Sequence, residues 1–300
     1  MKRSPEQWID ENVKSQAGKT VIVTGANTGL GFETAQALYR ADANVIVACR
    51  NKDKAAAAIK KMEKHKSGGS LEVGILDLAD LKKVEEFTNN FKKNHDKLDL
   101  LINNAGIMIP PSSKTKDGFE VQFGVNFLGH FALTGYLFEC LNRSPNARVV
   151  TLSSIAHRGG NIDFNNFRLE KNYDKWREYR QSKLACLMYT LELQKRIEKV
   201  GSSVISLGSH PGVSASGLTK NMEKEAVDKI EFMETLQGAL PTILAATSPK
   251  ARGGEYYGPD GPEEKSGYPA IASVDKVALD EAIAAKLWGE AQKITNLVYP

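Results

Sequence analysis

KTVIVTGANTGLGFETAQALYR, residues 19–40, joins a short β-branched run to a segment whose apolar residues recur at helical spacing. The run predicts a buried strand and the segment predicts a helix. Gly25, Gly29 and Gly31 lie where glycine allows a tight turn, close approach of a pyrophosphate and packing of the helix on the sheet. The first amides of the helix and its dipole favour an anion. The stretch therefore predicts the first βα unit of a dinucleotide-binding fold, with an unliganded glycine-rich turn as the other interpretation.

The rest of the chain repeats this alternation of strand and helix. Further strands are predicted at 44–50, 71–78, 98–106, 147–154, 202–212 with its exit turn, and 253–261 with a turn. Helices are predicted at 29–42, 53–66, 81–94, 118–142, from Tyr179 to 199, twice between 221 and 248, and at 274–295. Each strand is apolar on both faces, so the pattern predicts an α/β fold with a parallel, doubly wound (Rossmann) sheet of about seven strands and helices on both faces.

The chain shows no linker, internal repeat or low-complexity segment. Residues 1–300 are therefore predicted to form a single dinucleotide-binding domain. Around its centre we expect an N-terminal arm at 1–17, either a surface arm or a short leading helix. We also expect an inserted loop on the substrate side at 156–175 and a C-terminal extension with a helix at 259–300.

Composition narrows the function classes. The net charge of +4 is carried largely by lysines at helical spacing with glutamates, which is typical of solvated helix faces and does not predict nucleic-acid binding. Cys49, Cys140 and Cys186 lie in apolar stretches and are predicted to be reduced core cysteines. No apolar run reaches the length of a membrane span, and MKRSPEQWIDENVKSQ lacks the apolar core of a signal peptide, so a cytoplasmic protein is expected. The five histidines show no metal-ligand spacing, and no metal is predicted.

The end of the second predicted strand bears on the choice of cofactor. An acid there usually holds the ribose of NAD, but this chain has Arg50. A guanidinium can bind a 2′-phosphate by paired hydrogen bonds, so NADP(H) is favoured over NAD(H). Thr28 and Asn27 could add neutral donors, and a plain surface cation is the alternative for Arg50. Asp77 ends the third predicted strand, where it could accept from the adenine amine or cap the next helix.

Four more motifs follow in order: NNAG at 103–106, Asn126 in VQFGVNFLG, TLSS ending at Ser154, and YRQSK at 179–183. With TGANTGLG they resemble the single-domain branch of the short-chain dehydrogenase/reductase family. The resemblance covers about residues 18–258. Within the family the chain is most similar to the retinol-dehydrogenase-like group, through TGANTGLG, ACR, LINNAGIM, DGFE, GVNFLGHF, SSIAHR, SKLA and HPG.

The resemblance implies that Ser154, Tyr179 and Lys183 are catalytic, with Asn126 completing a proton relay. Tyrosine ordinarily loses its proton near a pKa of about 10, which suits neutral pH poorly. A cation at about 4 Å contributes roughly 4 kcal/mol at an effective dielectric near 20, and Lys183 one helical turn away could supply it. Ser154 could donate to the substrate oxygen. Capping by Ser154 and backbone satisfaction by Asn126 are the structural alternatives, and residues 180–182 are expected to be mostly spacing.

The expected cofactor contacts come from the glycine loop, the strand ends and the catalytic helix. They are Gly25, Asn27, Thr28, Gly29, Leu30, Gly31, Arg50, Asp77, Leu78, Asn104, Ala105, Gly106, Tyr179, Lys183, Pro211, Gly212 and Val213. His210 in HPG is expected to be structural.

Substrate contacts are expected from segments that flank the catalytic groups. They are Ser154, Tyr179, Ile107, Met108, Ile155, His157 and Trp176, with residues 213–222 as further candidates. Several are apolar, which suits a hydrophobic aldehyde or ketone, although ordinary core residues are the alternative.

Two departures from the family pattern stand out. Ser154 and Tyr179 are further apart than in most members, and the intervening insertion is expected to form part of a wall or lid. Many animal retinol dehydrogenases begin with a membrane anchor, and none is expected here.

The expected activity is reversible NADP-dependent reduction of a small-molecule carbonyl compound. A catalytically silent NADP-binding sensor or interaction protein, and a lyase or isomerase using the same site, stay open. The resemblance also implies a homodimer or homotetramer built through the Tyr179 helix, a surface that the insertion could obstruct.

Overall fold

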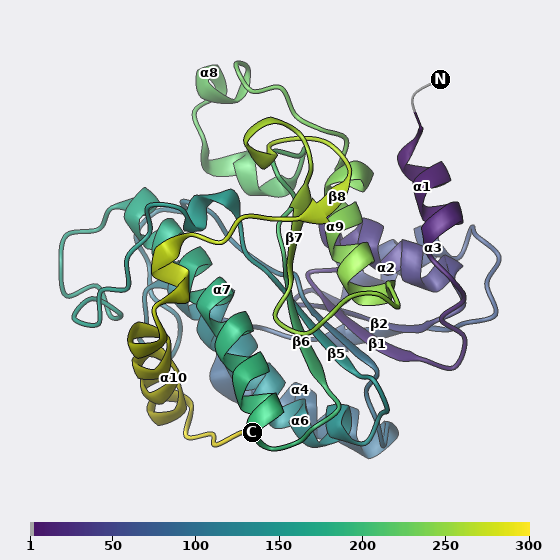
Figure 1. Ribbon diagram of the computed structural model, residues 1–300, viewed down its shortest axis with the longest axis horizontal. Helices are drawn as coiled ribbons and strands as arrows, with labels where there is room; N and C mark the ends of the chain where they lie inside the picture. Colours follow the sequence, from purple (N-terminus) through teal and green to yellow (C-terminus); the bar gives the residue numbers. More distant parts are fainter. Residues whose placement is uncertain (1–2) are drawn as a thin grey trace.

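A mostly parallel sheet forms the centre of the computed structural model, which describes residues 3–300 (Figure 1). Within these residues the sheet has eight strands in the order β3-β2-β1-β4-β5-β6-β7-β8. Their bounds are β1 Thr20–Thr24, β2 Asn44–Cys49, β3 Leu71–Ile75, β4 Leu100–Asn103, β5 Arg148–Leu152, β6 Ile205–Ser209, β7 Tyr256–Pro259 and β8 Pro269–Ile271. The strand order reverses between β1 and β4. Doubly wound sheets bind ligands in the crevice at such a reversal.

The two edge strands differ from prediction. β8 pairs antiparallel with β7, so the sheet is not wholly parallel and has one strand more than predicted. β3 is partly exposed to solvent, with Val73 38% and Ile75 49% exposed. The sequence had predicted that both faces of every strand are buried. An edge strand packs against a neighbour on one side only, and its periodicity alone does not reveal this.

Helices cover both faces of the sheet and bury a core on each (Figure 1). One face carries α1 Pro5–Asn12, α2 Gly29–Arg40, α3 Lys52–Met62 and α9 Thr235–Thr247. The other carries α4 Leu81–Asn94, α6 Gly129–Asn142, α7 Lys175–Lys199 and α10 Glu281–Thr295. The short helix α8, Lys224–Val227, belongs to the segment between β6 and α9. None of the helices in the described part of the chain combines the length and apolar character needed to cross a membrane.

The helix predicted at 118–142 is interrupted by a π-turn. Its parts are α5 Val121–Phe123, the π-turn η1 Gly124–Leu128 and α6. Asn126 lies inside this turn. Single π-turns within α-helices are frequent at functional sites because they redirect side chains and backbone carbonyls.

The predicted N-terminal arm is a leading helix and not a surface arm. Ser4 forms a capping box with Gln7 at the start of α1. Trp8 and Ile9 are each only 6% exposed and join the core that α9 helps to form. Residues 1–2 of the predicted arm lie outside the described residues.

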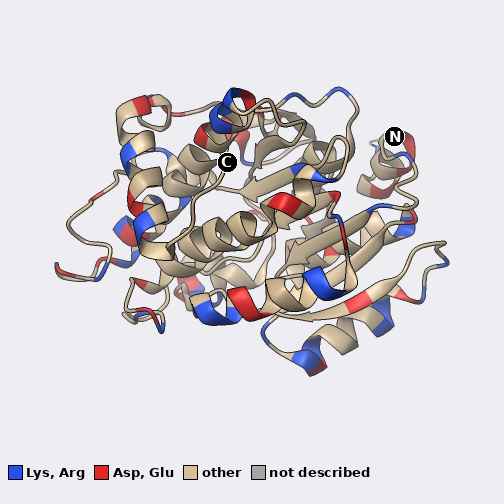
Figure 2. Ribbon diagram, turned by 90° about the horizontal axis from the view of Figure 1, so that it is seen from below, with Lys and Arg blue, Asp and Glu red and all other residues tan. Residues whose placement is uncertain are grey.

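Charged residues lie mainly on the outer helices and loops. Figure 2 shows Lys and Arg interspersed with Asp and Glu along these surfaces, while the central strands are almost free of charge. This arrangement agrees with solvated helix faces around an apolar centre.

Candidate active site

The glycine loop leaves β1 and enters α2 with a backbone that requires glycine. Gly25 and Gly29 have φ of +68° and +58°, a region that side chains with a Cβ rarely adopt. A Cβ on Gly31 would collide with the Asn104 side-chain amide and lie 2.5 Å from the Gly25 carbonyl oxygen. Thr28 precedes α2 but its side chain makes no capping hydrogen bond. The first amides of α2 therefore remain available to a ligand.

This loop forms the floor of a cavity of about 350 Å³. The cavity extends over the ends of β2 and β4, in the crevice at the strand-order reversal. Its lining includes twelve of the predicted cofactor residues: Gly25, Asn27, Thr28, Gly29, Leu30, Gly31, Arg50, Asp77, Leu78, Asn104, Ala105 and Gly106. A cavity lined by the glycine loop, by the unpaired amides at the start of α2 and by the cation Arg50 fits a dinucleotide phosphate.

Arg50 and Asp77 lie at the ends of neighbouring strands. Arg50 directly follows β2, is exposed and lines the cavity. β3 ends at Ile75, two residues earlier than predicted for the strand end at Asp77. The Asp77 carboxylate accepts a hydrogen bond from the Ala79 amide, and α4 is capped by Asp80. The alternative that Asp77 caps the following helix is therefore wrong, whereas its place in the cavity lining agrees with the cofactor prediction.

The NNAG loop is held in place by Thr24, a residue that the sequence analysis did not single out. The Thr24 hydroxyl accepts hydrogen bonds from the Asn104 and Ala105 amides, each at 2.9 Å. The Asn104 side chain donates to the Thr24 carbonyl at 2.7 Å. The only signal for this role in the sequence is a hydroxyl residue at the last position of a buried strand.

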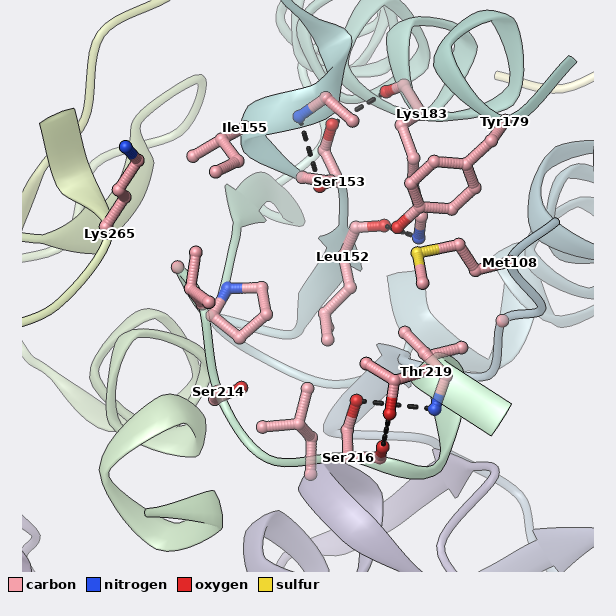
Figure 3. A pocket seen from close by; sticks show the side chains of 18 of the residues that line it. Met108, Leu152, Ser153, Ile155, Tyr179, Lys183, Ser214, Ser216, Thr219 and Lys265 are labelled. Carbon is pink, nitrogen blue, oxygen red and sulfur yellow. Dashed lines mark hydrogen bonds between the residues drawn. The ribbon is translucent and has the colours of Figure 1, made fainter. Parts of the chain in front are cut away.

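The predicted catalytic residues converge next to this loop. Ser154, Tyr179 and Lys183 line a second cavity of about 540 Å³, and Tyr179 and Lys183 are each only 4% exposed (Figure 3). The Lys183 ammonium donates to the Leu152 carbonyl oxygen at 3.1 Å. Both cavities share Asn104 and Gly106 in their lining, so the catalytic groups adjoin the glycine cleft.

Asn126 reaches the same place from the π-turn. Its side-chain Nδ2 donates to the Ile107 carbonyl at 3.0 Å, and its side-chain Oδ1 accepts from the Ile107 backbone amide at 2.9 Å. A Cβ added to Gly106 would lie 3.4 Å from Asn126 Oδ1 and 3.5 Å from Lys183 Nζ. Asn126 and Lys183 therefore both lie near the side of Gly106 to which a Cβ would project. The backbone that Asn126 satisfies belongs to the NNAG loop and not to its own helix, as the structural alternative had supposed.

Ser154 follows β5 and caps the short 3₁₀ helix Ile155–His157. Its Oγ accepts from the Ala156 amide at 3.1 Å. The hydroxyl proton makes no hydrogen bond to another residue in the described chain. Ser154 can therefore cap its loop and still donate into the cavity.

The three residues between Tyr179 and Lys183 do more than provide spacing. Ser182 accepts a hydrogen bond from the Asn126 amide at 2.9 Å. Gln181 accepts from the Asp163 amide at 2.7 Å and so anchors the insertion. Arg180 lines the larger cavity. The expectation of mostly spacing was wrong because helix periodicity does not reveal which tertiary partners a face will meet.

The larger cavity contains most of the predicted substrate residues. Met108, Ile155 and Trp176 line it, and the Trp176 ring lies edge-on at 6.4 Å from the Tyr179 ring. Ile107 lines the glycine cleft instead. Pro211, Gly212 and Val213, predicted for the cofactor, also line the larger cavity.

His157 is a correction to the predicted substrate set. It has no exposed surface and is not among the residues that line the cavity. Its ring nitrogens contact the Ser154 carbonyl at 2.6 Å and the Asp275 amide at 3.3 Å. Burial lowers the pKa of His157. The residue therefore lies behind the wall of the cavity and ties that wall to the C-terminal segment.

Part of the wall comes from segments that the sequence analysis missed. Ile230 and Phe232 approach from the segment after β6, and Glu263 and Lys265 from the β7–β8 connection. Figure 3 shows Lys265 across the cavity from Met108 and Tyr179. Sequence proximity to the catalytic motifs could not identify residues that arrive from a distant turn.

The insertion contributes less to the wall than expected. Of residues 156–175, only Ala156 and Arg158 line the cavity. Beyond them, Asn166 donates to the buried Glu178 at 2.9 Å and the Tyr173 hydroxyl donates to the Pro110 carbonyl at 2.7 Å. These bonds hold most of the insertion against α7 and the loop after NNAG.

His210 in HPG makes structural contacts, as expected. Its Nδ1 accepts from the Gly212 amide at 3.2 Å, so the proton of the neutral ring lies on Nε2, 3.0 Å from the Glu264 carboxylate. Burial lowers the pKa of His210 to about 4. This contact fixes the PG turn against the β7–β8 connection, where a Cβ on Gly212 would lie 2.5 Å from the Lys265 carbonyl oxygen.

Comparisons with known proteins agree with this geometry. The sequence model described as short chain dehydrogenase matches residues 19–227. Human retinol dehydrogenase 13 is 38% identical over 299 residues, covering 94% of this chain and 86% of that protein. Mouse retinol dehydrogenase 12 is 47% identical over 204 residues, covering 68% of this chain and 64% of that protein.

Solved structures show the same fold. An uncharacterized protein from Mycobacterium paratuberculosis is 38% identical and superposes with a TM-score of 0.82, covering 97% of this chain and 98% of that chain. RhlG of Pseudomonas aeruginosa, solved as an NADP active-site complex, is 23% identical with a TM-score of 0.64. It covers 81% of this chain and 94% of its own, and the likeness concerns the fold alone.

Proposed function

The chain belongs to the short-chain dehydrogenase family, in its retinol-dehydrogenase-like group, and on that premise we propose an NADP(H)-dependent reductase of apolar aldehydes or ketones. Membership itself supports interconversion of carbonyl compounds and alcohols with a nicotinamide cofactor. The finer proposal is that Tyr179 acts as the general acid and base and that the cofactor is NADP(H). One observation carries it: Ser154, Tyr179 and Lys183 line one cavity that adjoins the glycine cleft.

The proposed roles follow from what each side chain can donate. The nicotinamide, when bound, supplies or accepts the hydride. In the reducing direction the Tyr179 hydroxyl gives its proton to the substrate oxygen, and the free proton of Ser154 donates a hydrogen bond to the same oxygen. Lys183 stabilises the negative charge left on Tyr179, because its ammonium lies one helical turn away in the same poorly solvated site.

Asn126 supports this set indirectly. Its side chain holds the Ile107 backbone beside Gly106, and the Lys183 ammonium lies near the same side of that glycine. Its Oδ1 keeps one lone pair for a proton relay to Lys183, which is the role proposed for it.

The substrate class is proposed from the cavity lining. Met108, Leu152, Ile155, Trp176 and Phe232 present apolar surface around the catalytic groups. A cavity of about 540 Å³ is large enough for a drug-sized molecule, and the apolar surface around the catalytic groups favours a hydrophobic carbonyl compound. The relatives named retinol dehydrogenases are consistent with this class.

The test combines a substrate panel with one matched pair of variants. Aldehydes, ketones, quinones and alcohols are assayed with NADP(H) and NAD(H) for wild type, Tyr179→Phe and Tyr136→Phe. Tyr136 is a partly exposed tyrosine on α6 outside both cavities. Tyr179→Phe should lower kcat by about 10²- to 10⁴-fold while cofactor binding persists, and Tyr136→Phe should leave kcat unchanged.

Other outcomes point to the alternatives. Full activity of Tyr179→Phe would show that the proposed mechanism is wrong. Tight NADPH binding without turnover across the panel would favour a silent sensor or interaction protein. Product formed without net NADPH consumption would favour a lyase or isomerase. Single-domain organisation, a cytoplasmic location and the oligomeric state stay predictions.

A further inference from the structure

His130 is a buried histidine that lines neither cavity but contacts both halves of the site. It lies in the first turn of α6, directly after the π-turn, and is 1% exposed. Its Nδ1 lies 2.9 Å from the Asn126 carbonyl oxygen, and its Nε2 lies 2.9 Å from the Thr24 hydroxyl. Both ring nitrogens of this histidine therefore have partners, one at the end of β1 and one in the π-turn.

The partners determine where the ring carries its proton. A carbonyl oxygen can only accept, so Nδ1 bears the hydrogen that points to Asn126. In the neutral ring Nε2 is then an acceptor. Burial lowers the pKa of His130 to about 4, so the ring is neutral at physiological pH.

The hydrogen bonds of Thr24 show that its hydroxyl donates to His130. Its hydroxyl already accepts from the Asn104 and Ala105 amides, which use both of its lone pairs. The Thr24 hydroxyl oxygen lies 2.9 Å from His130 Nε2 and 3.3 Å from the Ile102 carbonyl oxygen, so His130 is the nearer acceptor for the hydroxyl proton. The Thr24 hydroxyl therefore donates to His130, and the chain of bonds runs from the NNAG amides through Thr24 and His130 to the π-turn.

This chain of bonds holds the NNAG loop at Asn104 and Ala105, whereas the Asn126 side chain holds the backbone at Ile107. Asn126 binds the loop at Ile107, while its carbonyl accepts from His130 and from the Cys186 thiol at 3.2 Å. Cys186 lies on α7, three residues after Lys183. The Asn126 carbonyl thus joins the loop, the π-turn and the catalytic helix.

We propose that His130 is a positioning residue that, as a neutral donor and acceptor, fixes the NNAG loop and Asn126 relative to each other and so aligns the cofactor cleft with the catalytic groups. This inference rests on the proposed function, because it takes residues 104–106 as cofactor-contacting. Among the groups that face the ring, Thr24 on β1 and Asn126 in the π-turn are uncharged. Cys186 on α7 is a buried thiol whose pKa is raised by burial, and among the described residues Lys183 on α7 is the charged group that helps to lower the pKa of the ring.

The test measures NADP⁺ and NAD⁺ dissociation constants by isothermal titration calorimetry, which needs no knowledge of the substrate. The variants are His130→Asn, Thr24→Val and the double variant. Asparagine keeps a donor near the Asn126 carbonyl but places no acceptor near Thr24, and valine removes the Thr24 hydroxyl. His130→Asn should weaken cofactor binding about tenfold, and Thr24→Val should weaken it at least as much, because valine also removes the acceptor of the Asn104 and Ala105 amides. The double variant should bind no more weakly than Thr24→Val, because both changes break one bridge.

Two further variants separate positioning from simple filling of the core. Thr34→Val is the matched control, because Thr34 is also fully buried but its hydroxyl has no hydrogen-bond partner in the described residues. Its dissociation constants should stay within about twofold of wild type. His130→Gln can place its side-chain oxygen near Thr24 and should recover part of the affinity that His130→Asn loses. Thermal unfolding confirms that each variant is folded.

Three results would overturn the proposal: wild-type affinity in both single variants, additive losses of about a hundredfold in the double variant, or equal losses in His130→Gln and His130→Asn. Failure of the wild-type protein to bind either cofactor would overturn the proposed function and this inference with it. Wild-type binding with unchanged variants would overturn this inference alone.

Discussion

At the scale of single residues, the choice of cofactor depends on one exposed cation. Arg50 follows β2 and lines the glycine cleft beside Asn27 and Thr28. Guanidinium pairs bidentately with phosphate, whereas an aspartate at this position would repel the 2′-phosphate and could accept from a free ribose hydroxyl. A surface arginine without this role would leave the cofactor preference to other residues.

Arg50→Asp should therefore shift preference from NADP⁺ towards NAD⁺. Loss of charge-assisted hydrogen bonds predicts a dissociation constant for NADP⁺ about 10- to 100-fold higher. Lys52→Asp is the matched control, since Lys52 is exposed two residues later, at the start of α3, and does not line the cleft. Fluorescence titration with both cofactors measures the ratio. An unchanged ratio in Arg50→Asp, or an equal shift in Lys52→Asp, would contradict the phosphate assignment.

The buried His130 also predicts a pH dependence of stability. Its pKa is about 4 in the folded protein and about 6.5 when unfolded, so the unfolded state takes up the proton first as pH falls. The contribution of neutral His130 to the free energy of unfolding is therefore complete above pH 6.5. It is lost between pH 6.5 and 4, at about 1.4 kcal/mol per pH unit. Glu120 acts in the opposite sense, because burial raises its pKa to about 7 and folding then favours its protonated form.

Subtracting the free energy of unfolding of a His130 variant from that of wild type removes the contribution of groups such as Glu120, which both proteins share. The free energy of unfolding of wild type minus that of His130→Asn should decrease as pH falls from 6.5 to 4. Urea denaturation followed by circular dichroism at several pH values measures it. A difference independent of pH would show that His130 titrates normally in the folded protein.

At the scale of elements, the start of α2 depends on a close backbone approach. Gly31→Ala would push a methyl group against the Asn104 amide and the Gly25 carbonyl. We expect the free energy of unfolding to fall by about 1–3 kcal/mol and NADP⁺ binding to weaken, because the loop must move away from the NNAG backbone. Denaturation and titration measure the two effects.

Gly289→Ala provides the contrast within another helix. Gly289 lies inside α10, and a Cβ there would meet nothing within 4 Å. Alanine should stabilise the protein by about 0.5–1 kcal/mol and leave cofactor binding unchanged. If both glycines responded alike, the special geometry of the α2 start would be refuted.

Local sequence patterns predicted those elements whose structure depends on nearby residues. The succession of strands β1 to β7 along the chain and the glycine cleft follow from periodicity and motif spacing, and the grouping of Ser154 with Tyr179 and Lys183 follows from the family resemblance. β8 was missed because a strand of three residues shows no usable periodicity. It pairs with β7 across a connection at 260–268 that contains none of the family motifs. The π-turn at Asn126 and the Thr24–His130 bridge were missed because they are set by tertiary hydrogen bonds.

At the scale of the whole molecule, the C-terminal segment is part of the main core. Trp288 on α10 stacks on Tyr189 at 5.8 Å and meets Phe131 edge-on at 5.0 Å between ring centroids. The Tyr299 hydroxyl donates to the Phe131 carbonyl at 2.8 Å. α10 thus lies along α7, the helix through which assembly was expected (Figure 1). Any assembly through that face must accommodate α10, a constraint that the sequence analysis had assigned to the insertion.

The same packing predicts how the protein unfolds. Trp288 is 2% exposed and the Arg196 guanidinium lies 4.5 Å above its ring, so Trp288→Ala removes aromatic packing from the centre of this core. We expect the free energy of unfolding to fall by about 3–5 kcal/mol. Val298→Ala, at a side chain 90% exposed in the same segment, should change it by less than about 0.5 kcal/mol.

The transition itself tests whether the chain is one cooperative domain. Trp8 is buried in the core on one face of the sheet and Trp288 in the core on the other. Tryptophan fluorescence of wild type therefore reports on both cores, whereas that of Trp288→Phe loses the signal of Trp288. For a single domain, both fluorescence curves should coincide with circular dichroism of the same protein in urea. Transitions that separate, or a loss below about 1 kcal/mol in Trp288→Ala, would show that the C-terminal segment folds as a dispensable extension.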